Sequence, residues 1–273
     1  MERLERTFRR LRSQRRKALI PFIMGGDPSL SLTGPLLLAL QTAGADLIEV
    51  GIPFSDPLAD GPVIQAASAR ALARGATPSR VLAAIASVRA QLSVPVVCLS
   101  YWNLVIQFGH GQRGPTHLGP EPFLQAIAAS GVSGLIVPDL PIEEGQRLHR
   151  AAAAAGVATI FLAAPTSPPE RLRHIARASH GFIYYVSVTG TTGARRTLPH
   201  GLVQGLRQLR LITTKPLCVG FGISTPAQAA TIAHTADGVI VGSALIHAID
   251  GARRGTDTLR NASRFLRSLR RTL

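Results

Sequence analysis

The sequence predicts an α/β chain folded as a single closed (β/α)8 TIM barrel, and three observations support that fold class. The chain has 273 residues, of which 46% are hydrophobic, so it can bury one large core. Barrels of this kind typically contain about 250 residues. Eight short apolar segments alternate with helix-like segments, and no break in composition divides them. We therefore expect residues 1–273 to form one domain.

The predicted strands are apolar at successive positions, which is typical of parallel strands buried on both faces. They are Ala18–Met24, Leu47–Gly51, Val94–Tyr101, Gly134–Val137, Ala158–Leu162, Phe182–Ser187, Pro216–Gly220 and Gly238–Val241. The predicted helices between them are Ser31–Ala43, Thr77–Gln91, Pro122–Ser130, Glu143–Ala155, Pro168–Ala178, Leu202–Leu211 and Pro226–Ala233. An open doubly wound sheet has the same alternation, so periodicity alone does not show that the barrel closes.

Both ends of the chain are basic and are expected to form amphipathic helices. Leu or Phe recurs at helical spacing between Arg3 and Arg16, and again between Arg253 and Arg271. The first of these, over residues 1–16, is an extra N-terminal helix in front of the barrel.

The net charge is +15, and nearly all of the positive charge is arginine, because Lys17 and Lys215 are the only lysines. Such a charge occurs in proteins that bind nucleic acids or anionic membranes. The sequence has no recognition-helix, zinc-finger or RNP signature, so we expect no nucleic-acid partner. An anionic substrate agrees with the charge equally well.

The cysteines and the absence of a long apolar segment indicate the cellular compartment. Cys98 and Cys218 each lie in an apolar segment, which predicts buried thiols rather than a disulfide. No segment approaches 18 consecutive apolar residues, and the N-terminus lacks a signal-peptide pattern. We expect a cytoplasmic protein that does not enter a membrane.

Three irregular segments interrupt the alternation. Residues 52–68 are predicted to be a long loop after the second strand, and residues 188–200 a second loop after the sixth. Loops that follow the strands of a barrel lie on its catalytic face. Residues 109–121 are predicted to be a surface insertion, and their two histidines do not indicate a metal site.

Two acidic residues at the second strand are the candidate catalytic groups. Glu49 lies within a buried strand, which costs free energy unless the carboxylate is paired or faces a polar cavity. Asp60 follows in a proline-restricted loop that can fold back over the strand end. Two carboxylates facing one substrate can divide proton transfer and charge stabilisation between them. A buried ion pair for Glu49 and a turn cap for Asp60 are the structural alternatives.

Glycines follow the last three strands, where barrels often bind phosphate. The segments are Gly190–Gly193, Gly220–Ser224 and Gly242–Ala244. Glycine lets backbone N–H groups approach an anion closely, and the start of a helix adds a favourable dipole. Tight turns without a ligand are the alternative explanation.

In both its acidic pair and its glycine segments, the chain resembles the tryptophan synthase alpha subunit family. The stretch Ile48–Gln65, IEVGIPFSDPLADGPVIQ, is similar to the most specific motif of that family. Supporting matches run from the first strand to the eighth: Phe22–Pro28, Tyr101–Val105, Val137–Glu144, Tyr185–Arg195, Gly220–Ser224 and Gly242–Ala244.

The resemblance implies reversible aldol cleavage of indole-3-glycerol phosphate to indole and glyceraldehyde 3-phosphate, without a metal or organic cofactor. Asp60 would stabilise the cation formed on the indole ring, and Glu49 would transfer protons. The implied substrate-binding residues are Phe22, Leu99, Tyr184, Thr192, Gly193, Gly222, Gly242 and Ser243.

The resemblance also implies a partner, the pyridoxal-phosphate-dependent beta subunit, in an alpha2beta2 complex. Pro53 and Asp56 on the first long loop, together with Asp139, would belong to the interface. The chain departs from the family pattern at Ser133, in the 109–121 insertion and in its basic charge. Another phosphate-binding barrel enzyme, or a barrel kept as a basic scaffold, remains as an alternative.

Overall fold

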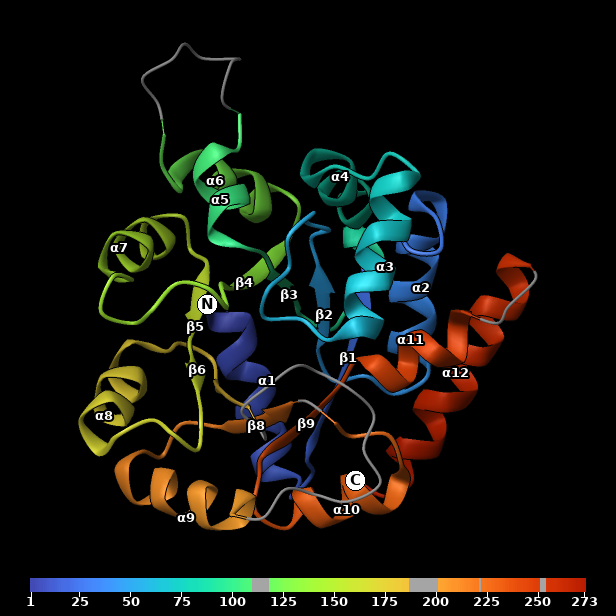
Figure 1. Ribbon diagram of the computed structural model, residues 1–273. Coiled ribbons are helices and arrows are strands. Elements are labelled where there is room, and N and C mark those ends of the chain that lie inside the picture. The colour runs from blue at the N-terminus through green and yellow to red at the C-terminus, as the bar shows by residue number, and fades with distance from the viewer. Residues whose placement is uncertain (110–117, 187–200, 221, 251–253) are drawn as a thin grey trace.

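The computed structural model describes residues 1–109, 118–186, 201–220, 222–250 and 254–273. Its strands are all parallel and form one sheet in the order β5-β4-β3-β2-β1-β9-β8-β7-β6 (Figure 1). They are β1 Ala18–Met24, β2 Ile48–Gly51, β3 Val96–Leu99, β4 Val132–Ile136, β5 Ala158–Ile160, β6 Leu162–Ala163, β7 Ile183–Val186, β8 Leu217–Gly220 and β9 Gly238–Val241.

The two ends of this sheet meet in one broken strand. Only Phe161 separates β5 from β6, and these two segments are the first and last in the sheet order. The sheet therefore has eight strand positions and closes on itself, which confirms the (β/α)8 barrel and excludes an open doubly wound sheet.

Helices surround the strands, as Figure 1 shows. They are α2 Leu30–Thr42, α3 Pro62–Ala73, α4 Pro78–Val88 with a short 3-10 turn Arg89–Gln91, α5 Trp102–Gln107, α6 Glu121–Ala129, α7 Gln146–Ala154, α8 Pro169–Ala178, α9 Leu202–Ile212, α10 Pro226–Ala233, α11 Ser243–Asp250 and α12 Gly255–Arg270. The predicted N-terminal helix is α1, Glu2–Ser13, and α12 is the predicted basic C-terminal helix.

One loop prediction is wrong. The loop after β2 ends at Gly61 rather than at residue 68, because Pro62 begins helix α3. Proline is favoured at the first position of a helix, where its missing N–H costs no hydrogen bond. The short helices α5 and α11 were also not predicted. Both begin almost directly after a strand, where the apolar segment hides the change in periodicity.

Helix α1 closes the N-terminal end of the barrel. Its buried residues include Leu4, Phe8 and Leu11, and the Phe8 ring lies 5.6 Å from the ring of Phe182. The terminal ammonium donates a hydrogen bond of 2.8 Å to the carbonyl of Gly156, just before β5. The catalytic face predicted from the loops is at the opposite end.

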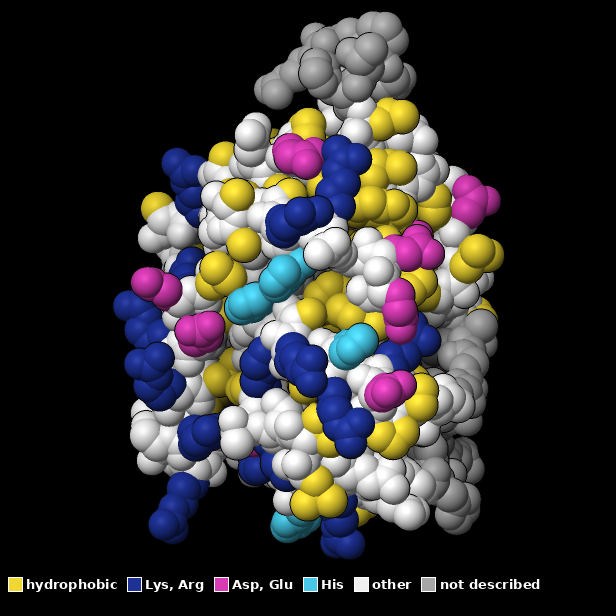
Figure 2. All heavy atoms as spheres, turned by 90° about the vertical axis from the view of Figure 1, so that its left-hand side faces the viewer, with side chains coloured by type: hydrophobic (Ala, Val, Ile, Leu, Met, Phe, Trp, Pro, Cys, Tyr) yellow, Lys and Arg dark blue, Asp and Glu magenta, His cyan; other side chains and the backbone are white. Residues whose placement is uncertain are grey.

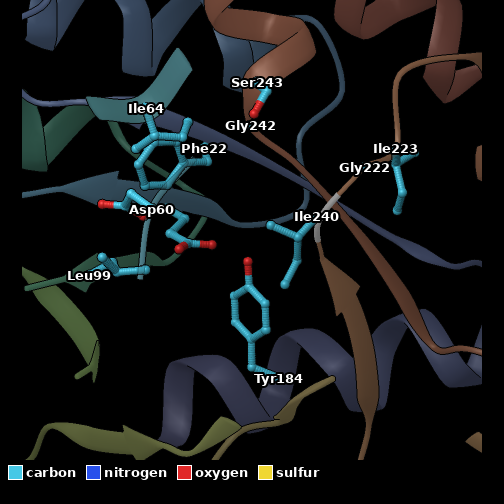
Figure 3. Close-up of a pocket in the computed structure, with 11 residues that line it drawn as sticks. Phe22, Asp60, Ile64, Leu99, Tyr184, Gly222, Ile223, Ile240, Gly242 and Ser243 are labelled. Carbon is cyan, nitrogen blue, oxygen red and sulfur yellow. The ribbon is translucent and has the colours of Figure 1, made fainter. Parts of the chain in front are cut away.

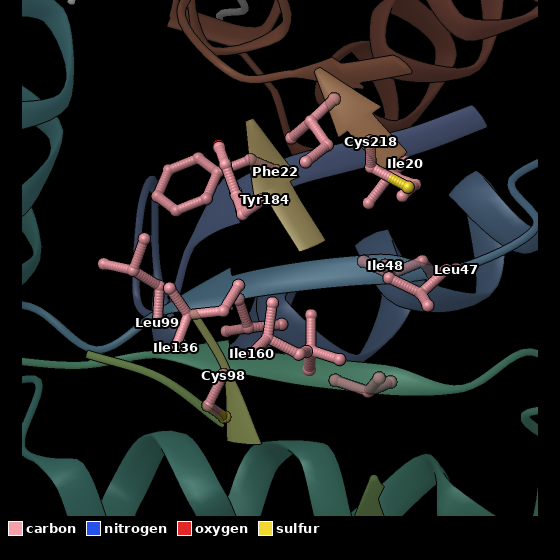
Figure 4. Packing of buried hydrophobic residues seen from close by; sticks show 14 of the residues in the cluster. Ile20, Phe22, Leu47, Ile48, Cys98, Leu99, Ile136, Ile160, Tyr184 and Cys218 are labelled. Atoms are coloured by element: carbon pink, nitrogen blue, oxygen red, sulfur yellow. The ribbon is translucent and has the colours of Figure 1, made fainter. Parts of the chain in front are cut away.

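The barrel interior is filled by side chains from the strands, several of which Figure 4 shows packed together. Cys98 and Cys218 belong to the same buried core cluster, and both are buried free thiols as expected. Within the described segments, no helix combines the length and apolarity that a membrane span requires.

Candidate active site

Glu49 lies on β2 and its side chain is completely buried. In the register of the barrel it is paired with Phe22 on β1 and with Val97 on β3. Neither carboxylate oxygen has a hydrogen-bond partner among the described residues, so the buried ion pair considered from the sequence is not present there. Burial, and then the charge of Asp60, raise the pKa of Glu49 from 4.5 to about 8.

Asp60 lies at the end of the loop between β2 and α3 and is only 6% exposed. Its backbone N–H donates to the carbonyl of Pro57 over 3.0 Å, and its own carbonyl accepts from the Gln65 side chain over 2.9 Å. Burial raises the pKa of Asp60 from 3.8 to about 6, although a hydrogen bond with Tyr101 lowers it. Around neutral pH Asp60 is therefore mostly ionised, whereas Glu49 keeps its proton.

Tyr101 connects this loop to the end of β3. Its hydroxyl accepts a hydrogen bond of 3.1 Å from the backbone N–H of Ala59 and is also hydrogen-bonded to the Asp60 carboxylate. The Tyr101 ring stacks on Phe54 with 5.1 Å between the ring centroids. Sequence reasoning did not assign Tyr101 a role at the site, although its position directly after a strand end was a usable signal.

One cavity is lined by the two carboxylates together with most of the predicted substrate residues. Figure 3 shows the Asp60 carboxylate and the Tyr184 hydroxyl pointing into it. Besides Glu49 and Asp60, its lining comprises Phe22, Ile64, Leu99, Tyr184, Gly222, Ile223, Ile240, Gly242 and Ser243. The isoleucines were not predicted, because nothing in the sequence distinguishes them from core residues.

Two glycines make room for the aromatic walls of the cavity. A Cβ atom on Gly51 would lie 2.7 Å from the ring of Phe22, and one on Gly220 would collide with the ring of Tyr184. Real Cβ atoms do not approach other heavy atoms so closely. The strand ends therefore carry glycine so that Phe22 and Tyr184 can lie flat against the neighbouring strands.

The part of the cavity that follows β8 and β9 has the features of an anion site. Gly222 has φ +83°, a left-handed conformation that glycine adopts without strain. Gly242 and Ser243 lie at the start of α11, where free backbone N–H groups and the helix dipole favour negative charge. The other two predicted substrate residues, Thr192 and Gly193, lie outside the described residues.

The three residues predicted for a partner interface differ in exposure. Pro53 is buried, whereas Asp56 is exposed on the same loop, next to Leu58, which is 88% exposed. The Asp139 carboxylate is exposed and accepts from the backbone N–H of Trp102 over 2.9 and 3.1 Å. In the described part of the chain, no group of three or more His, Cys, Asp or Glu side chains has the arrangement of a metal site.

The chain is similar over nearly its whole length to one family of known proteins. A family model described as "Tryptophan synthase alpha chain" matches residues 8–271. The tryptophan synthase alpha chain of Gloeobacter violaceus is 49% identical over 270 residues, which cover 98% of this chain and 94% of that relative. The alpha chain of Carboxydothermus hydrogenoformans is also 49% identical, over 92% of this chain and 90% of its own length.

Solved structures agree with these relatives. The alpha subunit from Legionella pneumophila superposes with a TM-score of 0.89 and 37% identity, covering all of this chain and 98% of that one. A chain of tryptophan synthase from Mycobacterium tuberculosis superposes with a TM-score of 0.87 and 36% identity, covering 99% and 97% of the two chains. This chain belongs to the tryptophan synthase alpha chain family.

Proposed function

We propose that the cavity between Glu49 and Asp60 is where this chain cleaves indole-3-glycerol phosphate to indole and glyceraldehyde 3-phosphate. That cleavage is the reaction of a tryptophan synthase alpha chain. The observation that carries the assignment to this cavity is the pair of buried carboxylates with unequal pKa values, which line the same cavity as the glycine-lined start of α11.

Glu49 supplies the proton in this proposal. Its pKa of about 8 keeps it protonated at neutral pH in the empty cavity, and its oxygens have no partner among the described residues. It delivers that proton to C3 of the indole, and the resulting carboxylate removes the proton from the hydroxyl on the adjacent side-chain carbon. The carbon–carbon bond then breaks, its electrons return to the ring, and Glu49 is protonated again.

Asp60 stabilises the intermediate cation. Protonation at C3 places positive charge on the indole nitrogen, and an ionised carboxylate accepting from that N–H lowers the energy of this state. The pKa of Asp60, about 6, leaves it ionised when Glu49 still holds its proton. The two carboxylates thus take different roles because their surroundings differ.

The remaining lining residues hold the substrate. Phe22 and Leu99 provide apolar surface for the indole ring, and Tyr184 lies beside both carboxylates. The phosphate is assigned to Gly222, which follows β8, and to Gly242 and Ser243 at the start of α11. Thr192 and Gly193 are kept as proposed contacts from the segment outside the described residues.

A pyridoxal-phosphate-dependent beta subunit is the proposed partner, in an alpha2beta2 complex. The exposed Asp56 and Leu58 on the loop that carries Asp60 would contact it directly, and the buried Pro53 would set the shape of that loop. Asp139 would join the interface through its contact with the start of α5. A cytoplasmic location is part of the proposal, and two buried free thiols agree with a reducing compartment.

The experiment is an assay of the purified chain with indole-3-glycerol phosphate, alone and with a beta subunit. We expect indole and glyceraldehyde 3-phosphate to appear in equal amounts, and faster when the beta subunit is present. Absence of indole in both conditions would contradict the proposed function. Equal rates in the two conditions would contradict the proposed partner alone.

A further inference from the structure

A basic hollow lies at the N-terminal end of the barrel, opposite the proposed active site. We call it the N-terminal basic hollow. It lies between α1 and the segments that precede β2 and β3. Among the described residues that line it, four are arginines and one, Asp46, is acidic; the arginines are Arg3, Arg6, Arg10 and Arg16.

Asp46 does not neutralise these arginines. Its carboxylate is buried and is already paired with Arg270 at 2.7 Å, and it also accepts from the backbone N–H of Leu19 over 3.1 Å. Arg16 and Arg10 lie farther away, at 3.5 and 3.9 Å. One carboxylate thus faces three guanidinium groups, and positive charge remains in excess around the hollow.

The like charges are close enough to influence each other. The pKa of Arg3 is lowered by burial and by the neighbouring charge of Arg6. The pKa of Arg270 is lowered by burial and by Arg16, against the opposing effect of Asp46. An anion bound between these groups would relieve this repulsion and so stabilise the fold.

The walls of the hollow are held in place by other contacts. The Gln41 side chain accepts from the backbone N–H groups of Ser93 and Val94 over 2.7 and 3.2 Å, and it donates to the carbonyl of Gln91 over 3.1 Å. Opposite this wall, Arg3, Arg6 and Arg10 project from helix α1, and Arg16 lies in the segment between α1 and β1.

A second basic hollow continues the first around the end of α1. Arg16 belongs to both, and the second is also lined by Arg12, Arg15 and Lys17. Arg15 has φ +54°, a left-handed conformation that costs a residue with a side chain about 1 kcal/mol or more. Figure 2 shows Lys and Arg side chains spread over the face that it presents, from the left-hand edge to the lower part, so positive charge is not confined to these hollows.

We propose that the N-terminal basic hollow binds a compact polyanion of the oligophosphate class. Guanidinium groups match phosphate oxygens with two parallel hydrogen bonds, and four of them around one concave surface suit a ligand with several phosphates. A nucleic acid is less suited, because none of the described residues that line the hollow is an aromatic on which bases could stack. The site is separate from the substrate phosphate site, which lies at the other end of the barrel.

The test uses tripolyphosphate as the probe and measures binding by calorimetry and the melting temperature of the full chain in 150 mM NaCl. We expect 1 mM tripolyphosphate to raise the melting temperature by about 3 °C or more. The variant R6Q/R10Q/R16Q should bind at least about tenfold more weakly, because charge-assisted hydrogen bonds are lost while Arg270 still pairs Asp46. R6Q alone, which removes an exposed arginine, should weaken binding about threefold if the triple variant does not fold.

The matched control is R260Q/R264Q/R267Q, which removes the same charge from the exposed face of α12. It should bind tripolyphosphate within about twofold of the native chain. Equal weakening in the control and the triple variant would mean a non-specific charge effect and would overturn the proposal. Unchanged binding in the triple variant, no binding by the native chain, or tighter binding of a single-stranded oligonucleotide than of tripolyphosphate would also overturn it.

Discussion

At the scale of single residues, Glu49 and Asp60 behave differently although both are buried. Glu49 is on a strand, has no hydrogen-bond partner among the described residues and has its pKa raised to about 8. Asp60 ends a loop, is hydrogen-bonded to Tyr101 and has a pKa of about 6. Desolvation raises the pKa of both carboxyl groups, and the hydrogen bond from Tyr101 opposes that rise at Asp60. The lower pKa of Asp60 suits a charge stabiliser, and the higher pKa of Glu49 suits a proton donor.

These pKa values predict a bell-shaped pH dependence of kcat/KM for indole release. The rate should rise as Asp60 loses its proton near pH 6 and fall as Glu49 loses its proton near pH 8, because the active form has one proton on the pair. Steady-state assays from pH 5 to 10 measure this. A rate that is flat across that range would contradict the assignment of the two protonation states.

The raised pKa of Glu49 also predicts how this residue changes the free energy of unfolding with pH. Below pH 4.5 Glu49 is protonated in both the folded and unfolded chain, so it contributes no pH dependence. Between about pH 4.5 and 8 only the unfolded chain ionises there, so stability falls as the pH rises. Urea unfolding at pH 5 and pH 9 should show a smaller loss for E49Q than for the native chain, by on the order of a few kcal/mol. Equal losses would mean that Glu49 does not have a raised pKa.

Most of the site residues were predictable from the sequence because they stand out against their surroundings. A Glu inside an apolar strand and glycines after three strands are departures from the local pattern, and six of the eight predicted substrate residues line the cavity. The isoleucines of the cavity were not predictable, since an apolar residue on a strand is the expected pattern in a core. Thr192 and Gly193 remain predictions.

At the scale of elements, Tyr101 determines where the loop between β2 and α3 places Asp60. The hydroxyl of Tyr101 contacts both Ala59 and Asp60, and its ring stacks on Phe54 in the same loop. A residue that follows β3 thus positions the carboxylate of Asp60, which lies on the loop after β2. The contact joins residues 42 positions apart in the chain, and the sequence pattern does not show which strand end a neighbouring loop will contact.

Y101F should lower kcat about tenfold without unfolding the protein, because Asp60 loses a hydrogen bond that holds it in place. Since that bond lowers the pKa of Asp60, the acid side of the pH profile should move to higher pH. The control is Y185F, which removes a buried hydroxyl that has no partner among the described residues. A tenfold loss of kcat with an unmoved acid limb would show that Tyr101 acts through packing alone.

The elements themselves were predicted best where a strand is buried on both faces. The continuous apolar segments correspond to strands of the barrel, and capping patterns such as Thr77–Pro78 begin helices as expected. The loop after β2 was predicted to be too long, because the Asp-Gly-Pro turn signal obscured the role of Pro62 as a helix start. Turn residues and helix-start residues are the same types, so their boundary depends on tertiary contacts.

At the scale of the whole molecule, the proposed catalytic residues and the ion pairs that stabilise the fold lie at opposite ends of the barrel. The proposed active site lies at the C-terminal ends of the strands, whereas the N-terminal end is closed by α1 and joined to α12 through Asp46. Arg270 of α12 pairs with Asp46 and also donates to the carbonyl of Lys17 over 3.2 Å. Part of the high positive charge is therefore structural, which composition alone did not reveal.

D46N should destabilise the chain by about 3 kcal/mol, because it leaves the partly buried Arg270 without its charge partner. Urea unfolding measures this, and indole release per folded molecule should not change. The control D257N breaks an exposed pair with Arg260 and should cost less than about 1 kcal/mol. Equal effects of the two substitutions would contradict a structural role for Asp46.

Turnover by E49Q measures whether Glu49 moves the proton in the cleavage. Indole release from indole-3-glycerol phosphate should fall at least about a thousandfold, because an amide cannot deliver or accept the proton. The isosteric change should leave the fold intact, and E2Q on the exposed surface of α1 should retain full activity. A folded E49Q that releases indole within tenfold of the native rate would contradict proton transfer by Glu49.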